Sequence, residues 1–408
     1  MRIVLLTSHY SPQMGYIENV LPKVLVQLGA EVHIVTSRLK GYFWLPEYER
    51  TYGGFCRGPA DMKDQEELYQ GCWIHYLPHR IYFHRVRLIG LYKKLKALRP
   101  DIVQTIAPSS LLEIEAALAK PALGYKLFTG CHMAPSVFPL ARDKHPFFCW
   151  ARVKNMIGNK LPGMLVNLAA DKCYGAAQCS ADLAVQYFGV SKKKSAVSVL
   201  GVDTEVFFPI DNAEMRAARS ALRRTLGFEE GELVCIYTGR YSEDKNPLLL
   251  AQAVSRLFVQ GEPFRGLFVG EGIQGDRIKV LPGCVVHPFV HFRELGHFMR
   301  AAEIGVLPTQ ESTSMLDAAA CGLPIVVNHT MGAMERIDGN GLTYRLNDLD
   351  DLVRVLLVLR DSRYRERLGN IGAERMLGEF SWLAIARRRL GDYSAAVTLA
   401  KDRKRKET

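Results

Sequence analysis

The sequence predicts an α/β protein of two domains, each built on a doubly wound parallel sheet. The chain has 408 residues, more than one hydrophobic core usually supports, so two domains of roughly 200 residues are expected. Short, apolar, β-branched segments alternate with helical patterns from end to end, which is typical of βαβ units. Most of these segments are followed by Gly, Pro, Ser or Asn, the residues that usually end a strand.

The predicted strands fall into two series. In the first half they are Ile3–Leu6, Val32–Thr36, Trp73–Leu77, Ile102–Ile106, Lys126–Thr129, Gln178–Cys179 and Ala196–Leu200. In the second half they are Leu233–Thr238, Gly266–Val269, Cys284–Val286, Ile304–Leu307 and Pro324–Val327. Residues 39–70 show no clear period and are expected to be irregular.

The second series begins near Leu233, after a loop at Gly201 and a predicted helix over 213–226. The domain boundary is therefore expected near 203–212. We assign residues 1–205 to an N-terminal domain and 206–381 to a C-terminal domain. A last helix, at about 382–398, is expected to pack back on the first domain.

Composition favours a soluble protein of a reducing compartment. Hydrophobic residues make up 48% of the chain and charged residues 23%, as in ordinary globular proteins. The nine cysteines are scattered with no C-x-x-C pair, which disfavours disulfides and zinc. The opening apolar run is too short for a signal peptide, and no apolar stretch reaches the roughly 20 residues of a membrane span. A cytoplasmic location is expected.

Positive charge is concentrated in the first half. Residues 1–200 carry 25 Lys or Arg and 14 Asp or Glu, so the remainder carries 28 of each. Seven cations and no acid lie between Arg80 and Arg99, interleaved with Tyr82, Phe83 and Tyr92. The segment 146–168 also mixes aromatic residues with spaced cations.

A solvated helix face would account for the run at 80–99. An anionic membrane surface or a nucleic acid would account for it equally. Because basic and apolar residues occur together, the membrane is favoured over nucleic acid, with the protein held peripherally on the inner face.

Two cations follow the first strand of the second half. Gly239 and Arg240 come directly after Leu233–Thr238, and Lys245 follows five positions after Arg240. Ligands of open α/β sheets bind at such carboxyl ends, and a guanidinium with an ammonium suits a diphosphate. The alternative is that both are surface cations paired with Glu243 and Asp244.

The segment 307–324 places carboxylates beside a strand end. Glu311 and Asp317 flank Ser312, Thr313 and Ser314, any of which could cap a helix running to about Cys321. The acids could then serve only to favour the helix dipole. The free amides of such a helix start also form an anion site, so the structural and binding interpretations are compatible. The loop 332–341 adds a further acid, Glu335.

Two further candidates lie in the first half. Gly15 stands between the first strand and a helix through about Leu28, where backbone can approach a phosphate, although no G-x-G-x-x-G is present. His132 follows a predicted strand end. A lone histidine at such a place is more often a structural residue than a functional one.

The ordered set of motifs resembles the retaining glycosyltransferases of family 4, which have the GT-B fold. The matching segments are Met14–Glu18, Gly29–Val32, Gly201–Pro209, Gly239–Arg240 with Lys245, Asp317–Pro324 and Asn340–Leu342. The resemblance implies two facing Rossmann-like domains with a cleft between them.

The resemblance also implies roles for individual residues. Arg240 and Lys245 would hold the donor diphosphate, Asp317 the ribose hydroxyls and Glu311 the donor sugar, while His132 would lie beside the acceptor and the donor sugar. The family usually has two glutamates eight positions apart. Here the acids are six apart and the second is aspartate. Either the loop is shortened, or the amides of Ser312–Ser314 replace the first acid.

The sequence thus predicts a hexosyltransferase-type enzyme that moves a sugar from a nucleoside diphosphate donor to a sugar, lipid-linked or polysaccharide-precursor acceptor, with retention and without a metal. A sugar-nucleotide epimerase or a phosphorylase on the same fold is an alternative. A nicotinamide oxidoreductase is disfavoured by the missing glycine fingerprint. A non-catalytic membrane-associated or nucleic-acid-binding protein would fit the shortened acid loop.

Overall fold

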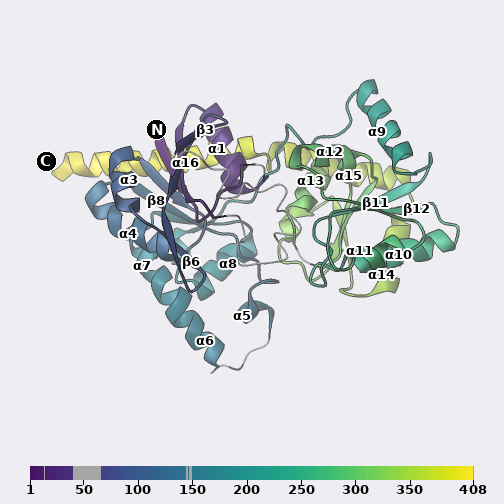
Figure 1. The fold of residues 1–408 in the computed structure, drawn as a ribbon, viewed down its shortest axis with the longest axis horizontal. Coiled ribbons are helices and arrows are strands. Elements are labelled where there is room, and N and C mark those ends of the chain that lie inside the picture. Colours follow the sequence, from purple (N-terminus) through teal and green to yellow (C-terminus); the bar gives the residue numbers. More distant parts are fainter. Residues whose placement is uncertain (13, 40–65, 144–145, 147–148, 310, 408) are drawn as a thin grey trace. The chain divides into compact units, whose positions relative to one another are not determined.

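The computed structural model describes residues 1–12, 14–39, 66–143, 146, 149–309 and 311–407. It divides into two compact units, unit 1 (residues 1–200 and 382–408) and unit 2 (residues 201–381). Each unit carries its own parallel sheet (Figure 1). The prediction of an α/β fold with two such domains is confirmed.

Unit 1 has an eight-stranded sheet in the order β10-β9-β8-β7-β1-β2-β4-β3, in which only β3 pairs antiparallel. A separate hairpin is formed by β5 and β6. The strands are β1 Arg2–Leu6, β2 Glu31–Ser37, β3 Glu66–Tyr69, β4 Cys72–Leu77, β5 His79–Tyr82, β6 Arg85–Leu88, β7 Ile102–Thr105, β8 Lys126–Cys131, β9 Lys172–Gly175 and β10 Ser195–Val197.

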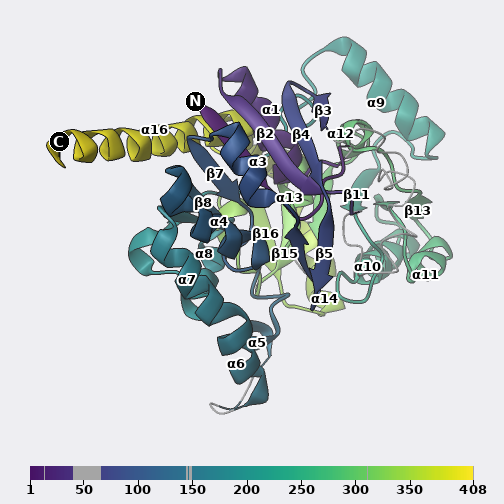
Figure 2. The ribbon, with the colours of Figure 1, turned by 60° about the vertical axis from the view of Figure 1, so that its left-hand side comes forward.

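Both faces of this sheet are covered by helices. Ile3 and Leu5 of β1 point into one core with α1 (Ile17–Gln27) and α16 (Trp382–Glu407), which run side by side in Figure 1. Val4 and Leu6 point into the opposite core. That core contains residues of α3 (Leu91–Leu98), α4 (Leu111–Leu123) and α7 (Leu161–Ala169), which Figure 2 shows on the face away from α16. Burial of alternate residues on both faces is the reason the strands are continuously apolar.

The last helix, α16, belongs to unit 1. Tyr393 is fully buried there, and its hydroxyl donates a hydrogen bond to Oε1 of Gln104 on β7 at 2.9 Å. Asp392 accepts from Nζ of Lys172 at 2.9 Å and from the hydroxyl of Tyr174 at 2.6 Å. These polar contacts fix the register of a helix that is otherwise held by its apolar face.

Unit 2 has a six-stranded parallel sheet in the order β13-β12-β11-β14-β15-β16. The strands are β11 Leu233–Thr238, β12 Phe264–Val269, β13 Cys284–His287, β14 Ile304–Leu307, β15 Ile325–Asn328 and β16 Gly341–Tyr344. The helices are α9 Ala213–Thr225, α10 Pro247–Val259, α11 Gly275–Lys279, α12 Phe292–Arg300, α13 Ser314–Ala320, α14 Leu349–Val358 and α15 Ser362–Gly378. In order of appearance along the chain, the strands lie 3-2-1-4-5-6, the dinucleotide-binding arrangement.

Several local predictions are wrong. Gln178–Cys179 is not a strand but the first turn of α8 (Gln178–Tyr187), and the true strand, β9, precedes it. The segment 39–70 is not wholly irregular, because it ends in β3, while its residues 40–65 lie outside the described part. The basic run at 80–99 is not one helix face, because it covers β5, β6 and α3.

Candidate functional site

The order of strands in unit 2 creates a switch point between β11 and β14. The chain leaves these neighbouring strands toward opposite faces, and ligands of open α/β sheets bind outside the carboxyl ends there. Arg240 follows β11, and Glu311 follows β14. The structure therefore brings the predicted cations and carboxylates of unit 2 to one edge.

The turn after β11 depends on glycines. Gly239 has φ +137°, in the region that favours glycine. On the next strand, a Cβ at Gly270 would lie 2.0 Å from the carbonyl oxygen of Gly239. A Cβ at Gly272 would lie 2.7 Å from the amide of Tyr241, and this amide donates to the carbonyl of Glu271 at 2.8 Å. Close backbone packing thus sets the direction in which Arg240 leaves the strand.

Lys245 links the two loops of the switch point. Its Nζ donates to the carbonyl oxygen of Glu311 at 3.3 Å. Burial lowers the pKa of Lys245, the nearby charge of Asp244 raises it, and that of Arg240 lowers it again. Among the described residues, no ion pair joins Arg240 or Lys245 to Glu243 or Asp244, so the paired surface cations are not observed. The charge of Glu311 also raises the pKa of Lys245, but no carboxylate of the described residues forms an ion pair with it. Such a half-buried ammonium is suited to an incoming anion.

The backbone of the loop after β14 is held by hydrogen bonds from side chains of β15 and β16. Asn328 Nδ2 donates to the carbonyl of Thr309 at 2.6 Å, and the Tyr344 hydroxyl donates to the carbonyl of Pro308 at 2.6 Å. The carboxylate of Glu311 accepts from the Gly332 amide at 2.7 Å. The loop therefore presents Glu311 on a fixed backbone, with its carboxylate bound to the loop 332–341.

The helix after this loop, α13, begins at Ser314 and is seven residues long. The expected side-chain cap is wrong, because Thr313 is the N-cap residue and its hydroxyl makes no capping hydrogen bond. Instead, the Ser312 hydroxyl accepts from the Ser314 amide at 3.3 Å. The Ser314 amide is therefore already engaged, and of the three amides proposed as a substitute for an acid, only those of Ser312 and Thr313 are left.

Asp317 lies on the first turn of α13 and is buried. Burial raises its pKa well above the ordinary value, and the negative charge of Asp203 raises it further. Asp203 is held in the turn 203–207, where its carboxylate accepts from the Glu205 amide at 3.1 Å. Two carboxylates close together in an apolar setting favour a proton or a hydrogen-bonding ligand.

Three hydroxyls at this edge are buried without a hydrogen-bond partner among the described residues. They belong to Thr238 at the end of β11, Ser242 in the following turn and Thr309 after β14. Buried polar atoms are nearly always paired in folded proteins. These three atoms offer hydrogen bonds to a polar ligand at the switch point.

The unit 1 candidates lie at the corresponding edge of the other sheet. Gly15 is in the loop after β1, and His132 follows β8, with its Nε2 3.3 Å from the position of a Cβ at Gly130. Two buried titratable groups also follow β1: His9 lies in the loop after the strand, and Glu18 of the segment Met14–Glu18 lies on the first turn of α1. Burial lowers the pKa of His9 to about 4 and raises that of Glu18 to about 7.

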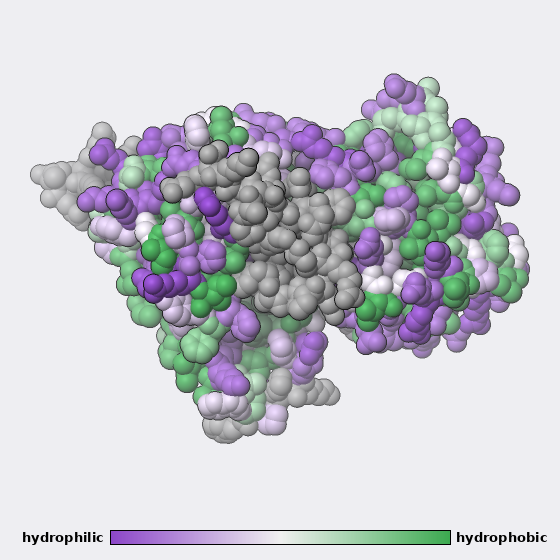
Figure 3. Space-filling model, in the orientation of Figure 1, coloured by the Kyte–Doolittle hydropathy of each residue, from purple (hydrophilic) through white to green (hydrophobic). Residues whose placement is uncertain are grey.

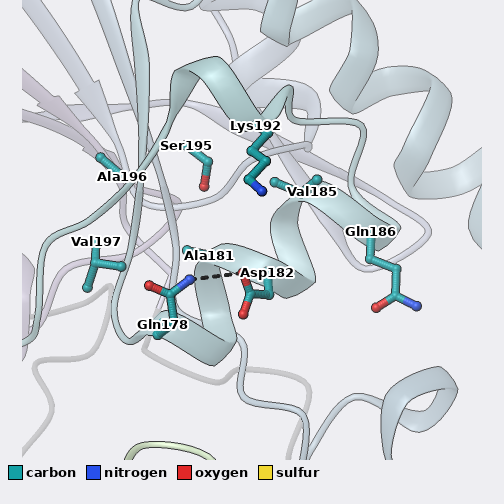
Figure 4. A pocket seen from close by; sticks show the side chains of 9 residues that line it. All are labelled: Gln178, Ala181, Asp182, Val185, Gln186, Lys192, Ser195, Ala196 and Val197. Atoms are coloured by element: carbon teal, nitrogen blue, oxygen red, sulfur yellow. Dashed lines mark hydrogen bonds between the residues drawn. The ribbon is translucent and has the colours of Figure 1, made fainter. Parts of the chain in front are cut away.

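A pocket of about 410 Å³ lies elsewhere in unit 1, lined by residues of α8 and β10 (Figure 4). Its polar side chains include Lys192 and the pair Gln178 and Asp182, joined by a 2.9 Å hydrogen bond. None of the predicted site residues lines it. Because it lacks the paired cations of the switch point, we assign the chemistry to the switch point.

Comparison with known proteins shows what the chain is similar to. Residues 232–361, which contain the switch point of unit 2, match the family model for glycosyl transferases group 1. This part of the chain is therefore similar to the group 1 glycosyl transferases.

Two relatives match the chain over about half its length. A D-inositol 3-phosphate glycosyltransferase of Geodermatophilus obscurus is 28% identical over 246 residues, covering 56% of this chain and 53% of that protein. The spore coat protein SA of Bacillus subtilis is 24% identical over 229 residues, covering 50% of this chain and 60% of that protein. The chain thus spans little more than half the length of these relatives.

Solved structures match the chain over nearly its whole length. HepE from Anabaena, crystallised in complex with UDP, has a TM-score of 0.70 at 16% identity and covers 97% of this chain and 100% of its own. Sucrose-phosphate synthase from Thermosynechococcus elongatus has a TM-score of 0.67 at 15% identity, with 98% and 99% covered. The predicted GT-B fold class is confirmed.

The sequence analysis missed residues that shape the site. Gly270 and Gly272 carried a visible signal, a Gly-x-Gly directly after a predicted strand. His9, at the end of β1, carried the same positional signal as His132. Asn328 carried none, because its role follows from pairing between strands that are distant in sequence.

Proposed function

We propose that this protein transfers a sugar from a nucleoside diphosphate sugar to an acceptor, with retention of anomeric configuration. The proposal rests on one observation above all: Lys245 contacts the backbone of Glu311 at the switch point of the unit 2 sheet. Arg240 lies in the loop after β11, and Asp317 lies on α13, the helix that follows the Glu311 loop. Two cations suit a diphosphate, and two carboxylates suit the hydroxyl groups of a ribose and a sugar.

Each residue then has a chemical role. Arg240 and Lys245 stabilise the negative charge that grows on the leaving diphosphate. An oxygen of that diphosphate accepts the proton of the attacking acceptor hydroxyl as the new glycosidic bond forms on the same face. Asp317 binds the ribose hydroxyls and Glu311 the donor sugar. Gly15 contributes backbone near a phosphate, and His132 orients the acceptor or a donor hydroxyl.

One relative is named a D-inositol 3-phosphate glycosyltransferase, which motivates a sugar phosphate as the first acceptor to be tried. The structurally similar HepE was crystallised with UDP and with UDP-glucose. These names motivate a uridine nucleotide as the first donor to be tried with this chain.

The decisive test is nucleotide binding by a variant of the switch point. A thermal-shift series with UDP, GDP and ADP sugars should identify one that stabilises the wild-type protein, by roughly 2.7 kcal/mol at a hundred times its dissociation constant. Arg240→Ala should lose this stabilisation. The control is Arg224→Ala, because Arg224 is exposed near the end of α9 and precedes the start of β11, whereas Arg240 follows its end. This variant should keep the stabilisation by nucleotide. If no nucleotide stabilises the wild type, or if Arg240→Ala responds like it, the proposal is wrong.

Product analysis then separates transfer from the alternatives. An NMR spectrum of the product anomeric proton should show the configuration of the donor. Donor conversion to an epimer without acceptor would instead indicate an epimerase. We further propose that transfer needs no metal, so full activity in EDTA is expected. Among the residues that the structure describes, no group of three His, Cys, Asp or Glu has the geometry to hold a metal ion.

A further inference from the structure

We propose that unit 1 docks on an anionic lipid bilayer through one apolar helix face and the tip of a neighbouring hairpin. The helix runs from α6 (Trp150–Asn155) through a π-helical turn (Met156–Lys160) into α7. The residues at both junctions have right-handed helical dihedrals, so the three pieces form one helix of 20 residues. At 1.5 Å per residue, it is about 30 Å long.

The large apolar side chains of this helix point outward. Trp150 is 67% exposed, Ile157 64%, Leu165 61% and Leu168 78%. Val153, Leu161 and Met164 are also exposed, so the series advances in steps of three or four residues along one face. The step from 153 to 157 to 161 spans the π-helical turn, whose wider winding keeps all three on that face. We call these seven residues and Phe83 the apolar ridge.

The buried residues of the same helix are Asn155, Gly163 and Val166, of which only Val166 is a large apolar residue. Val166 packs in the core of unit 1. A Cβ at Gly163 would lie 1.7 Å from the carbonyl oxygen of Phe188, and Asn155 donates to the carbonyl of Tyr187 at 3.0 Å. Ordinary surface helices bury their apolar stripe and expose their polar one. This helix instead leaves most of its large apolar side chains exposed.

The hairpin of β5 and β6 adds to the ridge. Its tip holds Phe83 at φ +47° and His84 at φ +62°, and Phe83 is 97% exposed. Arg85 anchors the tip to the π-helical turn, because its Nη2 donates to Oδ1 of Asn159 at 2.8 Å and to the carbonyl of Gly158 at 2.5 Å. An aromatic residue in the left-handed region, at a fully exposed tip, is a costly arrangement for a surface that faces only water.

The positive charge around the apolar ridge favours an anionic lipid surface as its partner. Arg152, Lys154 and Lys160 lie along the helix, Arg80 lies on the hairpin, and no acid occurs between Asp143 and Asp171 or between Glu67 and Asp101. Lys154 Nζ lies 5.8 Å from the Trp150 ring, so cation and aromatic share one place on the surface. Aromatic and aliphatic side chains ringed by cations are typical of interfacial segments on anionic lipid.

A second copy of the chain fits this surface less well. A two-fold interface brings the same patch of both copies together, which would place cations against cations. A nucleic acid also fits less well, because exposed Ile and Leu offer bases no stacking surface. Figure 3 shows hydrophobic and hydrophilic residues side by side on the part of unit 1 that carries α6 and α7. None of the described helices is long and apolar enough to cross a membrane, so the proposed contact is peripheral.

Vesicle sedimentation tests the proposal on the full chain. Wild-type protein should sediment with phosphatidylglycerol-containing vesicles and much less with phosphatidylcholine alone, and added salt should weaken the binding. Ile157→Gln with Leu165→Gln should lower the partition constant at least tenfold. Arg152→Gln with Lys154→Gln should lower it roughly tenfold or more, on anionic vesicles only. Phe83→Asn provides an independent variant, because asparagine tolerates the left-handed region.

The matched control is Val259→Gln with Val280→Gln, two valines of unit 2 that are 72% and 78% exposed. It should sediment like wild type, and all variants should keep the wild-type melting temperature. Absence of wild-type binding would overturn the proposal, as would equal binding to neutral vesicles. Concentration-dependent self-association that Ile157→Gln with Leu165→Gln abolishes would show that the ridge binds a second copy instead. The test needs no sugar donor, so its outcome is independent of the transfer reaction.

Discussion

The ammonium of Lys245 donates a hydrogen bond to the backbone carbonyl of Glu311 at 3.3 Å, across 66 positions of sequence. This contact joins the loop after β11 to the loop after β14 at the switch point of the unit 2 sheet. It directs the ammonium toward a backbone dipole, and the nearby charges of Asp244 and Glu311 favour its charged form without forming an ion pair among the described residues. The ammonium is thereby positioned for an anionic ligand.

Replacing Lys245 should therefore reduce catalysis more than stability. Lys245→Ala is expected to lower kcat about a hundred- to a thousandfold, the usual effect of removing one preorganised charge partner of a transition state. The melting temperature of the ligand-free variant should stay close to that of wild type. Only one hydrogen bond is lost, and it is a long one to an uncharged backbone carbonyl. Steady-state kinetics and thermal melts measure the two effects.

Lys279→Ala is the control for Lys245→Ala, since Lys279 is exposed at the end of α11. It should leave both quantities unchanged. The pH dependence offers a second check. Burial lowers the pKa of Lys245, so its charge is lost as pH rises at a value below the ordinary 10.5. Donor affinity should fall over that range in the wild type and stay flat in Lys245→Ala.

Replacing Asp317 should raise the stability of the ligand-free protein and weaken its nucleotide binding. Asp317→Asn removes a carboxyl whose ionisation is opposed by burial and by the charge of Asp203, so the ligand-free protein should become more stable at neutral pH. The same change should weaken nucleotide binding about ten- to a hundredfold, as expected for a lost hydrogen bond to a charged group. Thermal melts with and without nucleotide measure both.

The pH dependence of stability tests the contribution of Asp317 independently. The pKa of Asp317 is raised in the folded protein, so the fold retains a proton that the unfolded chain has released above its ordinary value of 3.8. Stability from this group is full below that pH and declines as pH rises through the raised pKa. Asp317→Asn should abolish that decline. A variant that is less stable than wild type at neutral pH would contradict the assignment of an unpaired buried carboxylate.

Much of this site could be predicted from sequence because its parts are local. A strand end such as Thr238, followed by Gly239 and Arg240, places a cation at the carboxyl edge of a parallel sheet whatever the rest of the chain does. The short polar loop and small residues at 307–324 carry the same kind of information. The contact between Lys245 and Glu311 could not be predicted from local sequence, because it depends on β11 and β14 being neighbours in the sheet.

The elements that sequence missed are those whose signals are short or absent. Strand β9 has only four residues and includes a lysine and a glycine, so its run lacks the apolar character of a core strand. The hairpin of β5 and β6 turns through Phe83 and His84 in the left-handed region, where Asn or Gly normally marks the turn. Without that marker, the basic residues beyond it resemble a helix. The π-helical turn at 156–160 has no recognised sequence signal at all.

A buried glutamate in unit 1 should make stability depend on pH near neutrality. Glu18 is buried on the first turn of α1, and burial raises its pKa from 4.5 to about 7. The folded protein therefore keeps this proton between pH 4.5 and 7, where the unfolded chain has lost it. Stability contributed by Glu18 is present below pH 4.5 and declines through pH 7, by about 3 kcal/mol for a shift of this size.

Glu18→Gln should remove this decline, so that the variant gains stability over wild type at pH 8 and not at pH 4. Denaturant unfolding at several pH values measures the difference. Glu366→Gln, at an exposed position of α15, is the control and should follow the wild-type profile. Parallel profiles of Glu18→Gln and wild type would show that Glu18 is ionised in the fold.

A contact between glycines should control the packing of α13, the helix that carries Asp317. A Cβ at Gly369 of α15 would lie 2.0 Å from the carbonyl oxygen of Gly322, the residue that ends the α13 segment at φ +83°. Backbone cannot yield as a flexible side chain does, so Gly369→Ala should force α15 away from α13. Overpacking of this kind costs typically about 1–3 kcal/mol.

Gly378→Ala, at the end of the same helix, provides the matched comparison, because a Cβ there meets no atom within 4 Å. That variant should be as stable as wild type or slightly more stable, since alanine favours helix over glycine by up to about 1 kcal/mol. Thermal melts of both variants test the packing argument. If Gly369→Ala has the same melting temperature as Gly378→Ala, then Gly369 and Gly322 are not in contact. If it melts earlier and also binds nucleotide more weakly, then the packing of α15 against α13 positions Asp317, and the loss should be greater than lower stability alone accounts for.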